Sequence, residues 1–194
     1  MEDELMGMVQ RFVADRVPRG WHACDGARLS VRGNEALYSL VGTTYGGDAH
    51  EWFNLPLGGP ALPDTESPEL PGWFICIQGL YPVRPVDERA PERNMTDEYV
   101  GAIKAFAGTY APAGYMWCEG QELKITQNQM LFAVLMNRFG GDGRMTFRLP
   151  DMRAHDAAGK PIPFAPTSWG SPAPPGPHRP GWVICVDGLF PVRD

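Results

Sequence analysis

The 194-residue chain has no surplus of positive charge and no long apolar run, and these two absences exclude two large classes of function. Its formal net charge is −6, whereas a surface that binds nucleic acid needs clustered lysine and arginine to neutralise phosphates. No stretch approaches the roughly 20 consecutive apolar residues of a membrane-spanning helix. We therefore expect no nucleic acid among the partners and no membrane span.

Histidine and cysteine are scarce, with four of each, and neither occurs at a spacing typical of metal ligands. The sequence contains no Cys-x-x-Cys and no His-x-His pair. No motif pairs a nucleophile with an oriented base. We expect no metal, no cofactor and no catalytic residue, and we predict that the protein is not an enzyme. Met1–Leu5 is acidic and lacks the features of a secretory signal, so we expect any export to use another route.

What the sequence does contain is a duplication. Residues Phe12 to Pro56 recur 94 positions later, as Phe106 to Pro150, without a gap. A second block, Pro71 to Arg84, recurs as Pro180 to Arg193 at an offset of 109, so the second copy carries 15 extra residues. Solenoid repeats run roughly 20 to 50 residues, and a longer repeat therefore indicates a duplicated domain.

The duplication predicts two small domains of the α+β class. We place the first at 1–84, a linker at 85–97, and the second at 98–194 with a Pro-rich insertion at about 154–180. The linker is charged and contains proline, which is typical of an exposed, semi-extended connection. The 23 glycines and 20 prolines favour many turns and short strands over long helices.

One short helix is predicted in each copy, at 34–41 and at 128–135. Apolar residues there recur at helical spacing, so one face of each helix should pack inward. Asn34 and Asn128 lie near the helix starts, where a side-chain oxygen can accept hydrogen bonds from free backbone amides. Strands are predicted at 8–14 and at 21–24.

The residues kept in both copies are types that form turns and cores. The glycine-rich segments at 45–48 and 139–143 are interpreted as turns, because a phosphate loop needs a strand before it and a helix after it, and a calcium loop needs several oxygen ligands. The predicted structural motif comprises Pro18, Gly20, Cys24, Gly26, Gly46, Gly47, Asp48 and Cys76, with Pro112, Gly114, Cys118, Gly120, Gly140, Gly141, Asp142 and Cys185.

The four cysteines occupy matching places in the two copies, and two interpretations remain open. Cys24 could form a disulfide with Cys76, and Cys118 with Cys185, if their α-carbons lie within about 7 Å. Alternatively, each is a small buried thiol in a strand. The apolar runs around Cys76 and Cys185 favour the buried thiol.

Three segments of the second copy together form a highly specific pattern: Phe106–Gln121, Gln127–Phe132 and Phe139–Arg153. They resemble the phage tail collar domain, and a looser version of the pattern covers most of the first copy. The ending Ile184–Asp194 is similar to the C-terminal signature of stand-alone bacterial members called microcystin-dependent proteins. The resemblance implies two tandem collar-like domains.

The same resemblance implies a structural or receptor-contacting role in the virion tail, outside the cell or at the cell surface. Collar domains occur in phage tail fibres, whose trimeric chains meet host surfaces, and no catalytic residues are assigned to the family. Relatives often carry a histidine-containing segment before the terminal signature. Here that region offers only His155 and His178, so the trimeric metal site of the family is not carried over.

Two hypotheses for function follow. In the first, the protein is structural and assembles with itself, as an oligomer or filament, or with other tail or fibre subunits, because open strand edges and self-complementary surfaces favour such contacts. In the second, it is an adhesion module that recognises a cell-surface glycan or protein through loop aromatics. Trp52 and Trp169 have no tryptophan at the matching position of the other copy, and an alternative is that each caps a small core. The possible binding residues are Trp52, His50, Trp169, His155 and Arg153.

Overall fold

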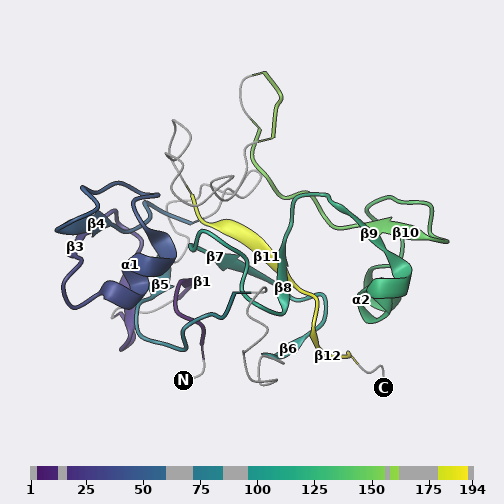
Figure 1. Cartoon of the computed structure of the whole chain (residues 1–194), viewed down its shortest axis with the longest axis horizontal. Coiled ribbons are helices and arrows are strands. Elements are labelled where there is room, and N and C mark those ends of the chain that lie inside the picture. The colour runs from purple at the N-terminus through teal and green to yellow at the C-terminus, as the bar shows by residue number, and fades with distance from the viewer. Residues whose placement is uncertain are drawn as a thin grey trace. The chain divides into compact units, whose positions relative to one another are not determined.

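The computed structural model describes residues 4–12, 17–59, 72–84, 96–155, 158–161 and 179–191. The chain forms two compact units (Figure 1). Unit 1 is Met1–Pro82 with Lys104–Tyr110 and Pro163–Gly181, and unit 2 is Val83–Ile103, Ala111–Ile162 and Trp182–Asp194. Most of the predicted linker and of the Pro-rich insertion lies outside the described residues, so the predicted domain boundaries stay predictions.

In unit 1, four strands lie side by side in the order β2-β5-β1-β7, and each neighbouring pair is antiparallel. A separate antiparallel pair, β3 and β4, lies beside the helix α1 (Figure 1). The bounds are β1 Met8–Arg11, β2 Trp21–Ala23, β3 Arg28–Ser30, α1 Glu35–Val41, β4 Trp52–Asn54, β5 Trp73–Cys76 and β7 Ile103–Phe106.

In unit 2, β8 pairs with β11 and β9 pairs with β10, both antiparallel. The strands β6 and β12 form a short parallel pair. The bounds are β6 Thr96–Tyr99, β8 Tyr115–Trp117, β9 Glu122–Lys124, the 3₁₀ turn η1 Ile125–Gln127, α2 Gln129–Leu135, β10 Thr146–Arg148, β11 Gly181–Cys185 and β12 Gly188–Leu189.

The two copies fold alike. The elements β2, β3, α1 and β4 each have a counterpart that begins 94 residues later, namely β8, β9, α2 and β10. The isolated parallel bridge between Leu5 and Leu80 corresponds to the pairing of Tyr99 with Leu189. Short strands, small sheets and one short helix per copy confirm the predicted α+β class and both predicted helices.

Each helix packs on the strand that follows it in the chain. Tyr38 of α1 lies against Phe53 of β4, with their ring centroids 5.4 Å apart, and Phe132 repeats the contact with Phe147 at the same 5.4 Å. Both strand phenylalanines are fully buried, and burying a ring of this size contributes about 1.5 to 3 kcal/mol. The helix spacing recognised in the sequence thus corresponds to this inward face.

The Pro-x-Gly segments form tight turns before β2 and β8. The amide of Trp21 donates to the carbonyl of Pro18 over 3.1 Å, and Gly20 has φ 83°. In the second copy, Tyr115 and Pro112 make the same contact at 3.0 Å. A positive φ at the third turn position requires glycine, which explains why the pattern was kept in both copies.

Unit 1 contains a strand from the second copy. The strand β7 pairs with β1 through Met8 opposite Phe106 and Val9 opposite Ala105. This register is symmetric about Gln10 and Lys104, which are equivalent residues 94 positions apart. Two copies of one strand therefore pair antiparallel with each other.

A carboxylate and a helix end hold β7 and the residues after it in place. Glu4 accepts hydrogen bonds from Gln10 Nε2 at 2.8 Å and from Lys104 Nζ at 3.2 Å, so one carboxylate contacts both equivalent residues. Beyond β7, the Thr109 amide donates to the carbonyl of Leu40 at the end of α1 over 2.9 Å. The chain after β7 thus covers the helix of the first copy.

Three expectations differ from the structure in detail. The predicted strand 8–14 is observed at Met8–Arg11, and 13–16 lie outside the described residues. The predicted capping by Asn34 and Asn128 is wrong, because neither side chain caps its helix. Their Nδ2 groups instead donate to the carbonyls of Ser30 and Lys124 four residues earlier, each over 3.0 Å. These asparagines join the helix start to β3 and β9.

Candidate functional site

The repeated Gly-Gly-Asp segments are turns built around one carboxylate oxygen. Asp48 Oδ1 accepts hydrogen bonds from the backbone amides of His50, Glu51 and Trp52 at 2.8 to 3.1 Å. Asp142 Oδ1 does the same for three amides at 2.7 to 2.9 Å. These bonds favour the charged form and lower the pKa of each aspartate to about 2. The shared aspartates therefore organise turns.

The four cysteines are buried free thiols. Burial, with a smaller contribution from neighbouring carboxylates, raises the pKa of both Cys24 and Cys118 to about 12. Burial also raises the pKa of Cys76 to about 11, and its Sγ donates to the Gln78 carbonyl at 3.4 Å. The thiolate is the nucleophilic form, so the raised pKa keeps Cys24, Cys76 and Cys118 in the less reactive thiol form at neutral pH.

Trp52 lies in strand β4, where a loop position was expected. The Arg28 guanidinium stands 3.9 Å from the centroid of its ring and covers one face of the indole. His50 and Glu51 precede it in the exposed turn organised by Asp48. The structure thus places His50 in the turn that leads into the strand of Trp52, while Trp169 lies outside the described residues.

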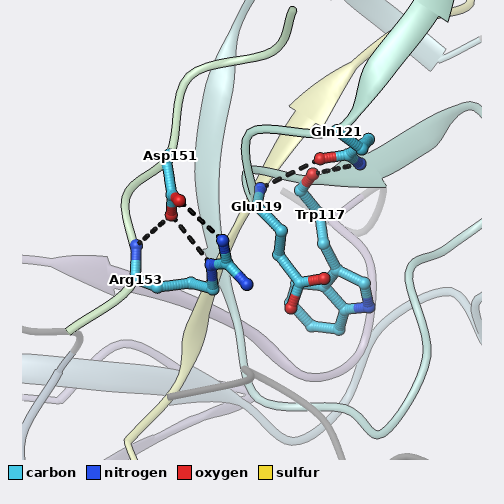
Figure 2. Close-up of polar contacts among 5 residues, drawn as sticks. All are labelled: Trp117, Glu119, Gln121, Asp151 and Arg153. Carbon is cyan, nitrogen blue, oxygen red and sulfur yellow. Dashed lines mark hydrogen bonds and ion pairs between the residues drawn. The ribbon is translucent and has the colours of Figure 1, made fainter. Parts of the chain in front are cut away.

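The most developed polar cluster is in the second copy, after β10. Arg153 donates from Nε and Nη2 to the two carboxylate oxygens of Asp151, at 2.8 and 2.6 Å (Figure 2). The Arg153 amide also donates to Asp151 Oδ1 over 3.2 Å. The side-chain bond to Arg153 lowers the pKa of Asp151, and His155 adds a smaller contribution. Such two-pronged pairs fix the plane of the guanidinium.

Three residues that follow or end β8 complete this cluster. Gln121 Oε1 accepts from the Glu119 amide at 3.1 Å, and Gln121 Nε2 donates to the Trp117 carbonyl at 2.7 Å (Figure 2). The negative charge of Glu119 adds to the effect of Asp151 in raising the pKa of Arg153. The bridge between Glu119 and Asp151 joins the two segments. The cluster is Trp117, Glu119, Gln121, Asp151 and Arg153.

Sequence reasoning found only part of this cluster. It singled out Arg153 and His155 as possible binding residues but gave no such role to the three residues near β8. A signal was present, because every cluster position differs between the copies on an otherwise shared backbone. The counterparts in the first copy are Ala23, Asp25, Ala27, Leu57 and Gly59.

The cluster offers hydrogen-bond donors and acceptors to a ligand. The ion pair uses Arg153 Nε and Nη2, which leaves Nη1 as a donor for a ligand, and an indole lies nearby (Figure 2). Hydroxyl-rich and carboxylate ligands are recognised by such donors. Within the described ranges, no group of three histidine, cysteine or acidic side chains could hold a metal ion.

The part of the chain that the structure describes contains no candidate membrane-spanning helix. None of its helices has the length and apolar character required to cross a bilayer. The longest, α1 and α2, contain seven residues each, whereas a spanning helix needs roughly 20.

Comparison with protein families gives one description for both copies. Residues 7–56 and 101–156 each match the Phage Tail Collar Domain. The two matches together cover more than half of the chain and fall on equivalent parts of the duplication. Comparisons with curated proteins and with solved structures gave no match. The resemblance to microcystin-dependent proteins stays a prediction.

Proposed function

The chain belongs to the phage tail collar domain family, and we propose that it is a non-catalytic subunit that assembles with itself or with other tail or fibre subunits and contacts a surface receptor. The family match supports a structural role in a phage tail fibre and a location in the virion tail. Assembly, receptor contact and an extracellular location are the parts that we add. They rest on the arrangement of strands and on the distribution of exposed side chains.

The observation that carries the assembly proposal is the pairing of β1 with β7. Two equivalent strands meet antiparallel, with Met8 opposite Phe106, so this fold already joins copies of itself by strand addition. Strand edges carry unpaired amides and carbonyls that can add a further strand. The same contact between chains would join subunits.

The proposal that the protein is not an enzyme rests on what the copies share. Their common aspartates accept three backbone amides each, and their common cysteines have raised pKa values where a shift is resolved. A hydrolase needs a nucleophile with a base in hydrogen-bonding reach. The shared groups of the described residues serve turns and cores.

Imaging and light scattering test the assembly proposal. We expect size-exclusion chromatography with light scattering to show oligomers that grow with protein concentration. Electron microscopy of the same sample should show ordered particles or filaments. A monomer at the highest soluble concentration, alone and after mixing with tail or fibre subunits, would remove the proposal.

The second candidate function is glycan or protein adhesion, and the cluster around Asp151 and Arg153 is the observation that favours it. These residues occur only in the second copy and include an indole and a free guanidinium donor. A glycan array of the full chain should show binding that is lost in Arg153→Ala and Trp169→Ala. Arg19→Ala, in an exposed turn of unit 1, is the control. Binding that survives both substitutions would contradict adhesion through these residues.

A further inference from the structure

The second copy carries a set of exposed apolar residues in and just after α2 that the first copy lacks. Its members, here called the α2 face, are Met130, Met136, Phe139 and Met145, with 43, 57, 45 and 73 % of each residue exposed. All four fall within one 16-residue segment. Exposed apolar patches mark binding surfaces, and methionine is common where such surfaces adapt to a partner.

The corresponding surface of the first copy is smaller, more polar and partly covered. The counterparts of the three methionines are Ala36, Gly42 and Glu51. The counterpart of Phe139 is Tyr45, whose hydroxyl donates to the Ala107 carbonyl at 3.0 Å. Burial raises the pKa of Tyr45 well above its usual range. In the first copy, the aromatic residue at this position is thus already in contact with Ala107 of the same chain.

Two arginines lie in the same segment as the residues of the α2 face. Arg138 and Arg144 are exposed, and neither forms an ion pair with any described residue. Their counterparts in the first copy are Thr44 and His50. The acidic residue of this loop, Asp142, already accepts three backbone amides. The face is therefore apolar with an uncompensated positive edge.

The matching elements of the first copy carry the opposite charge. Glu35 of α1 and Glu51 of the turn before β4 are exposed, and these two residues are here called the α1 face. The sequence of the whole first copy is likewise more acidic than that of the second. Residues 1–84 contain eleven acidic and six basic residues, whereas 98–194 contain eight acidic and nine basic residues.

We propose that the α2 face of one chain binds the α1 face of a second copy of this chain. This inference rests on the proposed self-assembly and assigns it a surface. Two different faces meet, so the contact is heterologous and leaves one face of each kind open on a pair of chains. Further copies add to the open faces, which produces a ring or an open filament.

Charge exchange on the full-length chain tests the contact directly. Arg144→Glu and Glu51→Arg should each weaken association about tenfold, because each puts like charges across the interface. The double variant should return the dissociation constant to within about threefold of the unmodified chain, since the pair is restored with reversed signs. Sedimentation velocity over a concentration series measures all three.

Two further measurements separate the apolar and ionic parts. Met130→Ser with Met145→Ser should weaken association at every salt concentration, because these side chains act by burial. Association of the unmodified chain should weaken as sodium chloride rises, since exposed charges are screened. Arg19→Glu changes an exposed charge away from both faces and should leave association unchanged.

The outcomes distinguish the contact from the function on which it rests. If the chain assembles but the charge variants and the serine variant associate normally, the α2 face is not the interface, and self-assembly stands. If single charge variants weaken association but the double variant does not recover, the pairing of the two faces is wrong. A chain that remains monomeric under all conditions overturns both proposals.

Discussion

Asp48 and Asp142 illustrate how one side chain can determine a turn. In each, a single oxygen accepts three successive backbone amides, which would otherwise need water or another partner. The sequence identified these segments as turns from their glycines and aspartate. It could not show that the aspartate faces the amides on its C-terminal side, because that requires the path of the following residues.

The pH dependence of stability should reveal how much Asp48 and Asp142 contribute to it. Their folded pKa of about 2 lies below the ordinary value of 3.8, so each contributes stability above about pH 4 that is lost as the pH falls towards 2. Asp142→Asn should lower the melting temperature at pH 7 and show a smaller further loss between pH 4 and pH 2. Thermal unfolding followed by circular dichroism at several pH values measures both.

Asp25→Asn provides the matched control for this prediction. Asp25 accepts one backbone amide, from Ala27 at 2.9 Å, so its replacement should have the smaller effect. Equal acid sensitivity of the unmodified chain and Asp142→Asn would contradict the assigned role.

At the scale of elements, the loop between helix and strand is tightly constrained in both copies. Gly141 has φ 93°, and a β-carbon there would lie 2.7 Å from the Thr146 carbonyl oxygen. A β-carbon at Gly47 of the first copy would lie at the same distance, 2.7 Å, from the Trp52 carbonyl oxygen. The loop backbone therefore lies directly on the following strand, and only glycine permits that approach.

Alanine substitution should separate close packing from backbone conformation. Gly33 has φ 90° and no atom within 4 Å of its β-carbon position, so Gly33→Ala should cost about 1 kcal/mol through its backbone alone. Gly141→Ala adds a collision with backbone atoms and should cost about 4 kcal/mol or prevent folding. Urea unfolding measures both, and similar losses in the two variants would show that the close approach has no energetic weight.

The helices, the turns and the α+β fold class were predictable from the sequence because their signals are local. The spacing of Leu37, Leu40 and Val41 is visible within one segment, and these residues are buried as that spacing implies. The pairing of β1 with β7 was not predictable, because it joins residues nearly 100 positions apart and leaves no local signal. The part of the cluster near β8 was missed for the same reason, because it meets Asp151 and Arg153 from about thirty residues away.

At the scale of the whole molecule, the two sequence copies and the two compact units do not coincide. Lys104–Tyr110 belongs to the second copy in sequence and to unit 1 in space. Unit 1 needs this segment to pair with β1 and to cover the end of α1. We therefore expect the first copy by itself to fold incompletely, because a domain of this size has a limited core.

Truncation should show this dependence. A fragment of residues 1–84 lacks β7 and exposes the paired edge of β1, so we expect it to be unfolded or aggregated. A fragment of residues 1–110 restores that strand and should give a cooperative thermal transition. Circular dichroism and light scattering of the two fragments provide the comparison. Equal folding of both would mean that β7 is dispensable for the fold of the first copy.

The pairing of β7 with β1 also affects how the protein is made. On the ribosome, one edge of β1 has no partner strand until the segment Lys104–Tyr110 has been synthesised, 28 residues after Pro82. At about 5 to 20 residues per second, this delay lasts about 1 to 6 seconds. During that interval nascent chains on one polysome expose unpaired edges to each other, so slower translation before residue 104 should increase misassembly and dependence on chaperones.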